Sequence, residues 1–501
     1  VNLIQKYKLY YLPVLLIFFT VLLLKMIFVF SYSVDNGGLE FYFINIFQHL
    51  HTGKPLYPNP ELFPYSNCLY TPVYFHILQI FIGLLHLEPK TDIYELLVLG
   101  RSISFALVIG QCIYIIKIIS KYKTGFYIQL VSVGLYLLLL TDHIFATRPD
   151  AFKLFFLSAF LYHLINYHFH NSTKKHFIFS LVFSLLAIFS KQDIIIHITL
   201  CYFTVLLLKR NKLAFYHFFV FAILSVFIFI GCYFMYGEFF FVNTILLNIQ
   251  QVTELHKSYL INIIPLSIIR TLPLLLLAVY NFKKSNQHPF EKEIKFFSIV
   301  SFAFYLISHV LITRAGANLN YTYELIFILV INYPIYIALN PIKSVSRKII
   351  QYIIMLCYFT FILVSNMGIR AINFNTSHLS TFKNEYYQYI TDKPLVDSII
   401  KEDTVFFPNT KFSIFYSDKK VILGHDMHLD RFIELYTTNA EIRSKLPFIN
   451  TQSYDKNFTN GVIKYILIEN DEKSKKQLTE NYPLYSPYAK SKYLLIYRYS
   501  K

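Results

Sequence analysis

Long apolar stretches recur along the chain up to residue 369, and each is close to the length that an α-helix needs to cross a lipid bilayer. Short polar segments separate them, and most of these segments carry lysine or arginine. The pattern is typical of a polytopic α-helical membrane protein. It predicts about 11 transmembrane helices, over residues 11–30, 97–118, 126–143, 151–169, 176–190, 192–208, 214–236, 263–282, 296–313, 322–340 and 349–369.

The basic residues fall in alternate connections between these stretches. All of the basic clusters can lie in the cytoplasm, as the positive-inside rule expects, only if the short apolar segment 73–87 does not cross the bilayer. We therefore predict that residues 73–87 form a helix along the outer membrane surface, that the N-terminus is cytoplasmic and that the C-terminus is outside. The basic clusters lie at 6–8, 117–123, 174–175, 209–212, 283–284 and 343–348.

Two external segments are longer than a simple connection requires. Residues 31–96 follow the first span, and residues 237–262 follow the seventh; both mix aromatic and polar side chains, as juxtamembrane helices on a membrane surface do. The first span itself, residues 11–30, is too long for the apolar core of a usual signal peptide. We interpret it as a retained transmembrane helix.

The composition changes near residue 370. Residues 370–501 carry 19 Lys and Arg against 15 Asp and Glu and contain no apolar stretch of spanning length. We predict two domains: a transmembrane domain, residues 1–369, and a small extracytoplasmic α/β domain, residues 370–501. The expected strands of the second domain are 404–407, 421–423, 462–468 and 493–497, with a helix at 430–436.

Composition excludes several classes of protein. A chain that is 55% hydrophobic and only 15% charged does not have enough polar side chains to cover a soluble globular fold. The net charge of +17 is explained by the basic loops of a membrane protein, so we expect no nucleic-acid partner. The five cysteines include no CxxC pair and predict neither a disulfide framework nor a zinc site.

Charged and polar residues gather at the predicted outer ends of the spans. An ionised side chain costs about 2.5–3.5 kcal/mol at the centre of a membrane, so such residues persist mainly where they line a cavity or an interface. Taken singly, a residue such as Arg101 or Asp193 is better explained as an anchor or a connector charge, but the set includes cations that oppose the orientation signal. Those cations, Arg148, Lys191 and Arg314, indicate a bound anion such as phosphate. The set as a whole comprises Asp35, Glu40, Arg101, Asp142, Arg148, Asp150, Lys191, Gln192, Asp193, Arg314, Asn318, Asn320, Tyr321 and Glu324.

A carboxylate that faces such cations fits glycosyl transfer from a lipid phosphate. The carboxylate would deprotonate the acceptor hydroxyl, and the cations would stabilise the departing phosphate. The sequence does not indicate whether the anomeric configuration is inverted or retained, because that outcome depends on the distance between carboxylates.

An ordered series of short motifs resembles the bacterial membrane glycosyltransferases of the GT-C class, related to protein O-mannosyltransferases and to the aminoarabinose transferase of lipid A. The series covers most of residues 1–340 and is more specific than any one of its members. It consists of Asp35-Asn-Gly-Gly-Leu-Glu40, Gly53-Lys-Pro-Leu-Tyr57, Tyr70-Thr-Pro-Val-Tyr74, Gly100-Arg-Ser-Ile-Ser104, Arg148-Pro-Asp150, Ser190-Lys-Gln192 and Gly316-Ala-Asn-Leu-Asn-Tyr-Thr-Tyr-Glu324.

The resemblance implies a polyprenyl-phosphate-linked sugar donor, a catalytic acid in the first external loop and a location in the bacterial inner membrane. Asp35 takes the general-base position, with Glu40 as the alternative, because many relatives have two adjacent acids there and Asn36 follows Asp35 in this chain. Because Asn36 replaces the second of these acids, the chain lacks the pair of adjacent carboxylates that could bind a divalent cation there. No metal or other cofactor is therefore expected. Donor phosphate contacts are expected from Arg148, Lys191 and Arg314, and pocket residues are Tyr70, Arg101, Asp150, Gln192, Asn320, Tyr321 and Glu324.

The expected acceptor is an envelope glycan, a lipid or a protein, and the expected surroundings are membrane lipids. Two alternatives remain open from the sequence. A transporter or flippase of lipid-linked saccharides would show internal repeats or interrupted helices at mid-membrane. A polysaccharide polymerase or ligase would share the external anion site but use a lipid diphosphate donor.

Overall fold

A computed structural model describes residues 12–31, 40–59, 68–170, 173–246, 248, 261, 263–286, 288–313, 319–340, 353–362, 364, 385–400, 404–406, 415, 421–423 and 458–500. The chain divides into two compact units. Residues 1–30, 101–230 and 251–377 belong to the first, which we call the helical unit. Residues 31–100, 231–250 and 378–501 belong to the second, which we call the mixed unit.

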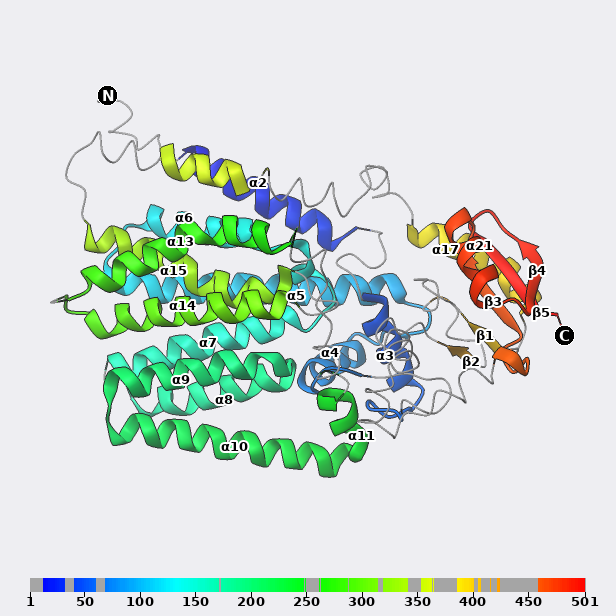
Figure 1. The fold of residues 1–501 in the computed structure, drawn as a ribbon, viewed down its shortest axis with the longest axis horizontal. Helices are drawn as coiled ribbons and strands as arrows, with labels where there is room; N and C mark the ends of the chain where they lie inside the picture. The colour runs from blue at the N-terminus through cyan, green and yellow to red at the C-terminus, as the bar shows by residue number, and fades with distance from the viewer. Residues whose placement is uncertain are drawn as a thin grey trace. The chain divides into compact units, whose positions relative to one another are not determined.

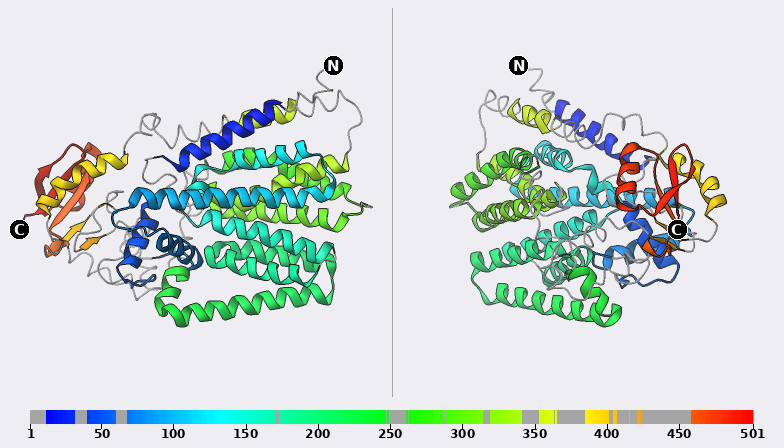
Figure 2. Two further views of the ribbon diagram at one scale, coloured as in Figure 1. Left: turned by 180° about the vertical axis from the view of Figure 1, so that it is seen from behind. Right: turned by 45° about the vertical axis from the view of Figure 1, so that its right-hand side comes forward.

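Long helices make up the helical unit, and α7, α8, α9, α13, α14 and α15 lie side by side (Figures 1 and 2). Each of the predicted spans coincides with one helix. The helices are α2 (Leu12–Val29), α5 (Ile93–Ile119), α6 (Phe126–Leu139), α7 (Asp150–Phe169), α8 (Lys174–Ser190), α9 (Ile195–Lys209), α10 (Lys212–Tyr236), α13 (Ile264–Lys284), α14 (Glu291–Ile312), α15 (Tyr323–Leu339) and a helix at Ile353–Ile362.

Six helices in the described part of the chain are long and apolar enough to cross a membrane. They extend over Ile93–Tyr122, Gln192–Lys209, Lys212–Tyr236, Ile264–Lys284, Glu291–Ile312 and Leu319–Leu339. Shorter apolar helices lie at Phe18–Val29, Val73–Leu84, Phe126–Leu139 and Ile353–Ile362. The prediction of a polytopic helical membrane protein is confirmed.

Burial separates the centre of the helical unit from its periphery. Of the 18 residues in the apolar stretch that covers most of α15, 78% are buried. In the corresponding stretch of α10 only 11% are buried. On α10, Phe227 and Phe234 leave 68% and 81% of their surface exposed. Because α10 is apolar all round, its exposed face is suited to lipid, whereas α15 packs among other helices.

Polar contacts link several of the basic connections between helices at one end of the helical unit. Lys121 Nζ, just after α5, donates a hydrogen bond to Asn166 Oδ1 near the end of α7 (2.9 Å). His170 Nε2 lies 2.9 Å from Glu293 Oε2 at the start of α14. These connections were predicted to share one side of the membrane, and they do share one end of the unit.

The mixed unit contains the first long segment predicted to be external, residues 31–96, and the first part of the second, residues 237–250. The first forms α3 (Glu40–His51) and α4 (Val73–Leu84), and the second begins with α11 (Glu238–Phe241) and a π-helical turn η5 (Val242–Leu246). Asn243 joins them: its Oδ1 accepts from the Cys68 backbone N–H (2.8 Å), and its Nδ2 donates to the Pro58 carbonyl (3.0 Å). Both segments therefore contain short helices, as predicted.

Helix α4 is too short to span a bilayer. Its 12 residues extend about 18 Å at 1.5 Å per residue, whereas the hydrocarbon core of a bilayer is about 30 Å thick. Its length agrees with the prediction of a surface helix for residues 73–87.

A five-stranded sheet forms the C-terminal part of the mixed unit, with strand order β2-β1-β3-β5-β4. Strand β1 is parallel to β2 and to β3, and β5 is antiparallel to β3 and to β4. Asp392 of α17 accepts a hydrogen bond from the Tyr493 backbone N–H in the β4–β5 connection (3.2 Å). The elements are α17 (Glu385–Ile399), β1 (Thr404–Phe406), β2 (Val421–Leu423), β3 (Tyr465–Glu469), α21 (Glu472–Asn481), β4 (Tyr485–Lys490) and β5 (Leu494–Tyr499).

The four predicted strands are present, and β4, α17 and α21 are additional. Strand β4 was not predicted because Pro487 is unfavourable in a central strand. In the structure β4 lies at an edge of the sheet, where proline is tolerated. Helix α21 begins after Asp471, whose Oδ1 accepts from the Ser474 backbone N–H (2.9 Å), an N-cap that the sequence analysis did not use. The predicted helix at 430–436 and the predicted domain boundary near residue 370 lie outside the described residues.

Candidate functional site

Three sequence-distant segments meet at one end of the helical unit, opposite to the end that holds Lys121 and Glu293. They are the connection from α6 to α7, with its 3-10 turn η3 (Asp142–Phe145); the turn η4 (Gln192–Ile194) between α8 and α9; and the turn η8 (Leu319–Thr322) that leads into α15. Helix α7 begins directly after Pro149, which suits a helix start because its missing N–H is not needed there. Asp150 is therefore the first residue of α7, where the helix dipole favours a negative charge.

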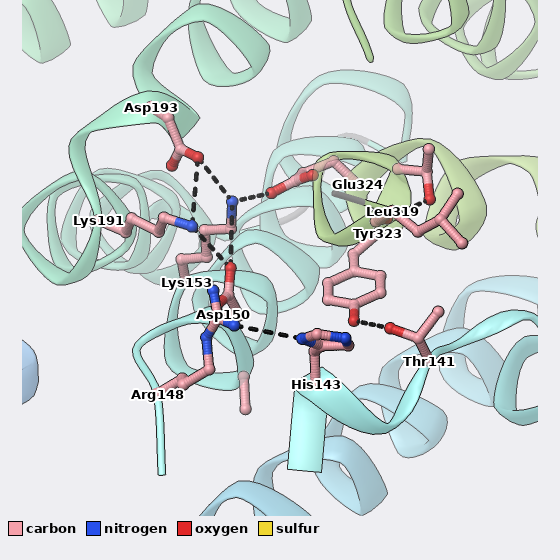
Figure 3. Close-up of polar contacts among 12 residues, drawn as sticks. Thr141, His143, Arg148, Asp150, Lys153, Lys191, Asp193, Leu319, Tyr323 and Glu324 are labelled. Atoms are coloured by element: carbon pink, nitrogen blue, oxygen red, sulfur yellow. Dashed lines mark hydrogen bonds and ion pairs between the residues drawn. The ribbon is translucent and has the colours of Figure 1, made fainter. Parts of the chain in front are cut away.

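Asp150 bridges two cations (Figure 3). Its Oδ2 accepts a hydrogen bond from Arg148 Nε at 3.1 Å, and its Oδ1 accepts one from Lys191 Nζ at 2.8 Å. The Asp150 side chain has no exposed surface, and Arg148 and Lys191 are also buried. Arg148 additionally donates from Nη1 to His143 Nδ1 (3.3 Å), which ties the guanidinium to the η3 turn.

Lys153 lies one turn further along α7 and contacts three carboxylates. Its Nζ is 2.6 Å from Glu324 Oε1, 3.0 Å from Asp193 Oδ2 and 3.9 Å from Asp150 Oδ1. Asp193 also lies 3.6 Å from Lys191 Nζ. The Lys153 side chain is 1% exposed, so its charge depends on these carboxylates rather than on water.

An aromatic side chain and a hydroxyl pair complete the described surroundings. The Tyr321 ring lies 5.3 Å from Lys191 Nζ and 5.9 Å from Lys153 Nζ, within the range of cation–π attraction. Tyr323 is hydrogen-bonded through its hydroxyl to the Thr141 hydroxyl, which connects α15 to the start of the η3 connection (Figure 3).

We call Arg148, Asp150, Lys153, Lys191, Asp193 and Glu324 the charge cluster. Among the described residues that form it, cations and carboxylates are equal in number. Ionised groups removed from water require such pairing, because an isolated buried charge is strongly destabilising. The cluster therefore holds one guanidinium and two ammonium groups beside carboxylates, near one end of the long helices.

The structure brings together most of the site residues that were predicted in the helical unit. Arg148, Asp150, Lys191 and Glu324 are members of the charge cluster, and Tyr321 borders it. Gln192 and Asn320 lie in the same turns as cluster members, η4 and η8.

Arg101 is a different case. It is fully buried on α5, and its guanidinium faces the Phe28 ring of α2 at 5.9 Å. One turn further along α5, Ser104 Oγ donates to the Ala146 carbonyl (2.9 Å), so this part of α5 packs against the η3 connection.

The remaining predicted residues lie elsewhere. Glu40 is the first residue of α3 and is buried, and Tyr70 is buried against the Tyr42 and Phe43 rings; both belong to the mixed unit. Asp35 and Arg314 lie outside the described residues. Their predicted roles therefore stay predictions.

Lys153 was missed by the sequence analysis. It was counted as part of the apolar stretch 151–169, although one charge within such a stretch is itself a sign of function. Its spacing from Asp150 also placed both side chains on one face of a helix. Asp193 was noted at an outer turn but was not assigned to the site.

Within the described ranges, no group of three or more His, Cys, Asp or Glu side chains is arranged to hold a metal ion. The three carboxylates of the charge cluster face ammonium or guanidinium groups instead. Each cation of the charge cluster is thus paired with at least one carboxylate.

Comparison with solved structures identifies the architecture. Over 99% of its length the chain resembles the crystal structure of ArnT from Cupriavidus metallidurans bound to undecaprenyl phosphate, with 12% sequence identity, a TM-score of 0.59 and 98% of that chain covered. The apo state of the same ArnT gives a TM-score of 0.55 at 12% identity, with 99% of this chain and 98% of that one covered. The archaeal oligosaccharyltransferase AglB from Archaeoglobus fulgidus, in complex with an inhibitory peptide and a dolichol-phosphate, gives 0.51 at 12% identity, with 99% of this chain and 75% of that chain covered.

No protein-family model matches the chain, and no curated protein matches it significantly. At 12% identity the structural likeness establishes a shared fold. The fold implied by the sequence resemblance is therefore confirmed: the chain shares the fold of ArnT and of AglB.

Proposed function

We propose that this protein is a glycosyltransferase that moves a hexosyl or pentosyl group from a polyprenyl-phosphate-linked donor to a cell-envelope acceptor. The acceptor is a glycan, a glycolipid or a protein on the outer side of the bacterial inner membrane, with the N-terminus cytoplasmic and the C-terminal domain extracytoplasmic. One observation carries the proposal: Arg148, Lys153 and Lys191 are buried together at one end of the membrane helices. This arrangement occurs in a fold shared with ArnT, which was solved with undecaprenyl phosphate, and with AglB, which was solved with a dolichol-phosphate.

The cations account for the phosphate part of the reaction. A guanidinium group offers a planar pair of donors to phosphate oxygens, and an ammonium group adds a point charge. Within a site that excludes water, such groups stabilise developing negative charge more strongly than they would in water. Arg148 and Lys191 are the proposed donor contacts, with Arg314 as a third contact from the segment before α15.

An acidic residue of the first external loop is the proposed general base that activates the acceptor. Asp35, or Glu40 in its place, would accept the proton of an acceptor hydroxyl as that oxygen attacks the anomeric carbon of the donor sugar. The bond between the anomeric carbon and the phosphate oxygen then breaks, and its electron pair stays on the phosphate. General-base catalysis of this kind contributes about 10²–10⁴ in rate.

The proposal is tested with the full-length protein in lipid nanodiscs. A radiolabelled polyprenyl-phosphate sugar serves as donor, and envelope extract from a deletion strain serves as acceptor. Arg148→Ala should raise the apparent donor KM by more than the acceptor KM, whereas Lys121→Ala, at the other end of the unit, should leave both unchanged. Equal donor use by wild type and Arg148→Ala would reject the phosphate role.

The general base is assigned with two further variants. Asp35→Asn should abolish transfer while expression and membrane insertion stay normal. Full turnover by Asp35→Asn together with an inactive Glu40→Gln would move the base to Glu40.

The alternative functions give different results in the same system. A flippase would move the labelled donor between leaflets of proteoliposomes without forming a new glycosidic bond. A polymerase or ligase would use a lipid diphosphate donor in preference to the monophosphate.

A further inference from the structure

Asp150 engages the same cations to which the proposed function assigns the donor phosphate. Each of its carboxylate oxygens accepts from a different one: Oδ2 from Arg148 Nε and Oδ1 from Lys191 Nζ. Carboxylate and phosphate oxygens are equivalent acceptors for these donors. A phosphate that uses these N–H groups must therefore displace the Asp150 carboxylate.

The charge cluster offers Asp150 another partner. Lys153 Nζ lies 3.9 Å from Asp150 Oδ1, on the same face of α7, so a small rotation of the carboxylate away from Lys191 brings it towards Lys153. Lys153 is itself held in place by Glu324 and Asp193. Displacement of Asp150 would therefore leave no buried charge without a partner.

The charge of the phosphate changes during the proposed reaction. A sugar-phosphate diester carries one negative charge, and the released lipid monoester carries about 1.5–2 at neutral pH because its second pKa is near 6. A site built from cations alone would bind the product more tightly than the donor. A carboxylate that competes for the same cations counters this tendency.

We infer that Asp150 is a displaceable counter-anion, which positions Arg148 and Lys191 between turnovers and competes with the lipid phosphate for them, so that the polyprenyl monophosphate product is released. The inference rests on the proposed function and names the residue that sets product release. The alternative is that Asp150 only orients the two cations and keeps its contacts when phosphate binds. The two possibilities predict opposite effects of removing the carboxylate charge.

The test measures binding of a short-chain polyprenyl monophosphate to the full-length protein in nanodiscs. Asp150→Asn should bind this probe about tenfold more tightly than wild type, because one competing charge is removed from the two contacted cations. In the transfer assay, the inhibition constant of the monophosphate should fall by a larger factor than the donor KM. Asp193→Asn is the matched control: it changes the net charge equally, and at the two contacted cations it removes only the longer contact to Lys191 (3.6 Å), while the Asp150 bridge stays intact, so it should tighten binding by about twofold or less.

Each outcome decides a separate point. Weaker binding by Asp150→Asn, comparable to the loss in Arg148→Ala, would show that Asp150 only orients the cations and would overturn the inference. If Asp150→Asn and Asp193→Asn increase the affinity for the monophosphate equally, the effect is explained by net charge alone, and the inference is overturned as well. If the wild type does not bind the monophosphate, or if Arg148→Ala binds it equally well, the proposed function fails instead.

A second measurement does not depend on the folding of the variant. A structure of the wild-type protein with the monophosphate bound should show Lys191 Nζ and Arg148 Nε within hydrogen-bond distance of phosphate oxygens, with Asp150 turned towards Lys153. Retention of both Asp150 contacts beside a bound phosphate would overturn the inference.

Discussion

Lys153 Nζ of α7 lies 2.6 Å from Glu324 Oε1 of α15, and both side chains are 1% exposed. This contact joins α7, which begins at Asp150, to α15, most of whose residues are buried. It provides the link through which the packing of α15 holds the charge cluster in position.

Lys153→Met should lower the free energy of unfolding by about 3–5 kcal/mol, because it leaves Glu324 and Asp193 buried beside each other without their shared cation. The double variant Lys153→Met/Glu324→Gln should recover part of this loss, since one of the two carboxylates is then neutral. Tryptophan is absent from the chain, so unfolding is best followed through the reaction of the buried Cys112 and Cys201 with a thiol-reactive dye. Identical melting temperatures of Lys153→Met and wild type would show that the buried contact between Lys153 and Glu324 does not stabilise the fold.

Lys25 should position the connection between α6 and α7. It is buried on α2, forms an ion pair with Asp142 and lies 5.1 Å from the Phe145 ring, so the first helix contacts the η3 turn directly. We expect Lys25→Met to lower both the stability and the rate of glycan transfer, because Asp142 loses its buried partner. Adding Asp142→Asn should restore stability in part; a double variant less stable than Lys25→Met would argue against the pair.

Tyr323→Phe should reduce transfer by more than its effect on stability explains. It removes the hydroxyl contact to Thr141 that connects α15 to the η3 connection, at a cost of about 1–3 kcal/mol for a buried polar group that loses its partner. Tyr136→Phe is the control, because the Tyr136 hydroxyl donates to Gln111 Oε1 at 2.5 Å in a contact between α6 and α5 that the proposed reaction does not use. Both variants should melt at similarly lowered temperatures, and only Tyr323→Phe should lose activity. Equal transfer activity in Tyr323→Phe and Tyr136→Phe would show that the contact between the Tyr323 and Thr141 hydroxyls is not needed for transfer.

The topology is tested with single cysteines in a cysteine-free background. Glu88 follows α4, and its side chain is 43% exposed, so Glu88→Cys should react with a membrane-impermeant thiol reagent added from outside. Lys123, exposed after α5, should react as Lys123→Cys only after the membrane is permeabilised. Protection at Glu88 would mean that residues 73–87 cross the bilayer, contrary to our prediction from the basic loops.

Much of the fold was predictable because the bilayer imposes a simple rule on sequence. Each of the eleven predicted spans, residues 126–143 for example, coincides with a helix, since a chain in lipid must satisfy its backbone groups within each segment. The surface helix at 73–87 followed from the basic loops, and its short length agrees with that prediction. Strand β4 and helix α21 were less accessible, because an edge position and a single N-cap leave weaker signals than a span does.

The sequence by itself determined that this is a polytopic membrane protein and that charged residues gather in the turns that were predicted to lie outside, because polar residues in an apolar chain stand out by composition alone. Only the tertiary structure decided which of them are partners. Asp150 bridging Arg148 and Lys191, and Lys153 reaching Glu324, depend on how α7 is rotated against α8 and α15. That rotation is set by the packing of many side chains at once, and no short motif encodes it.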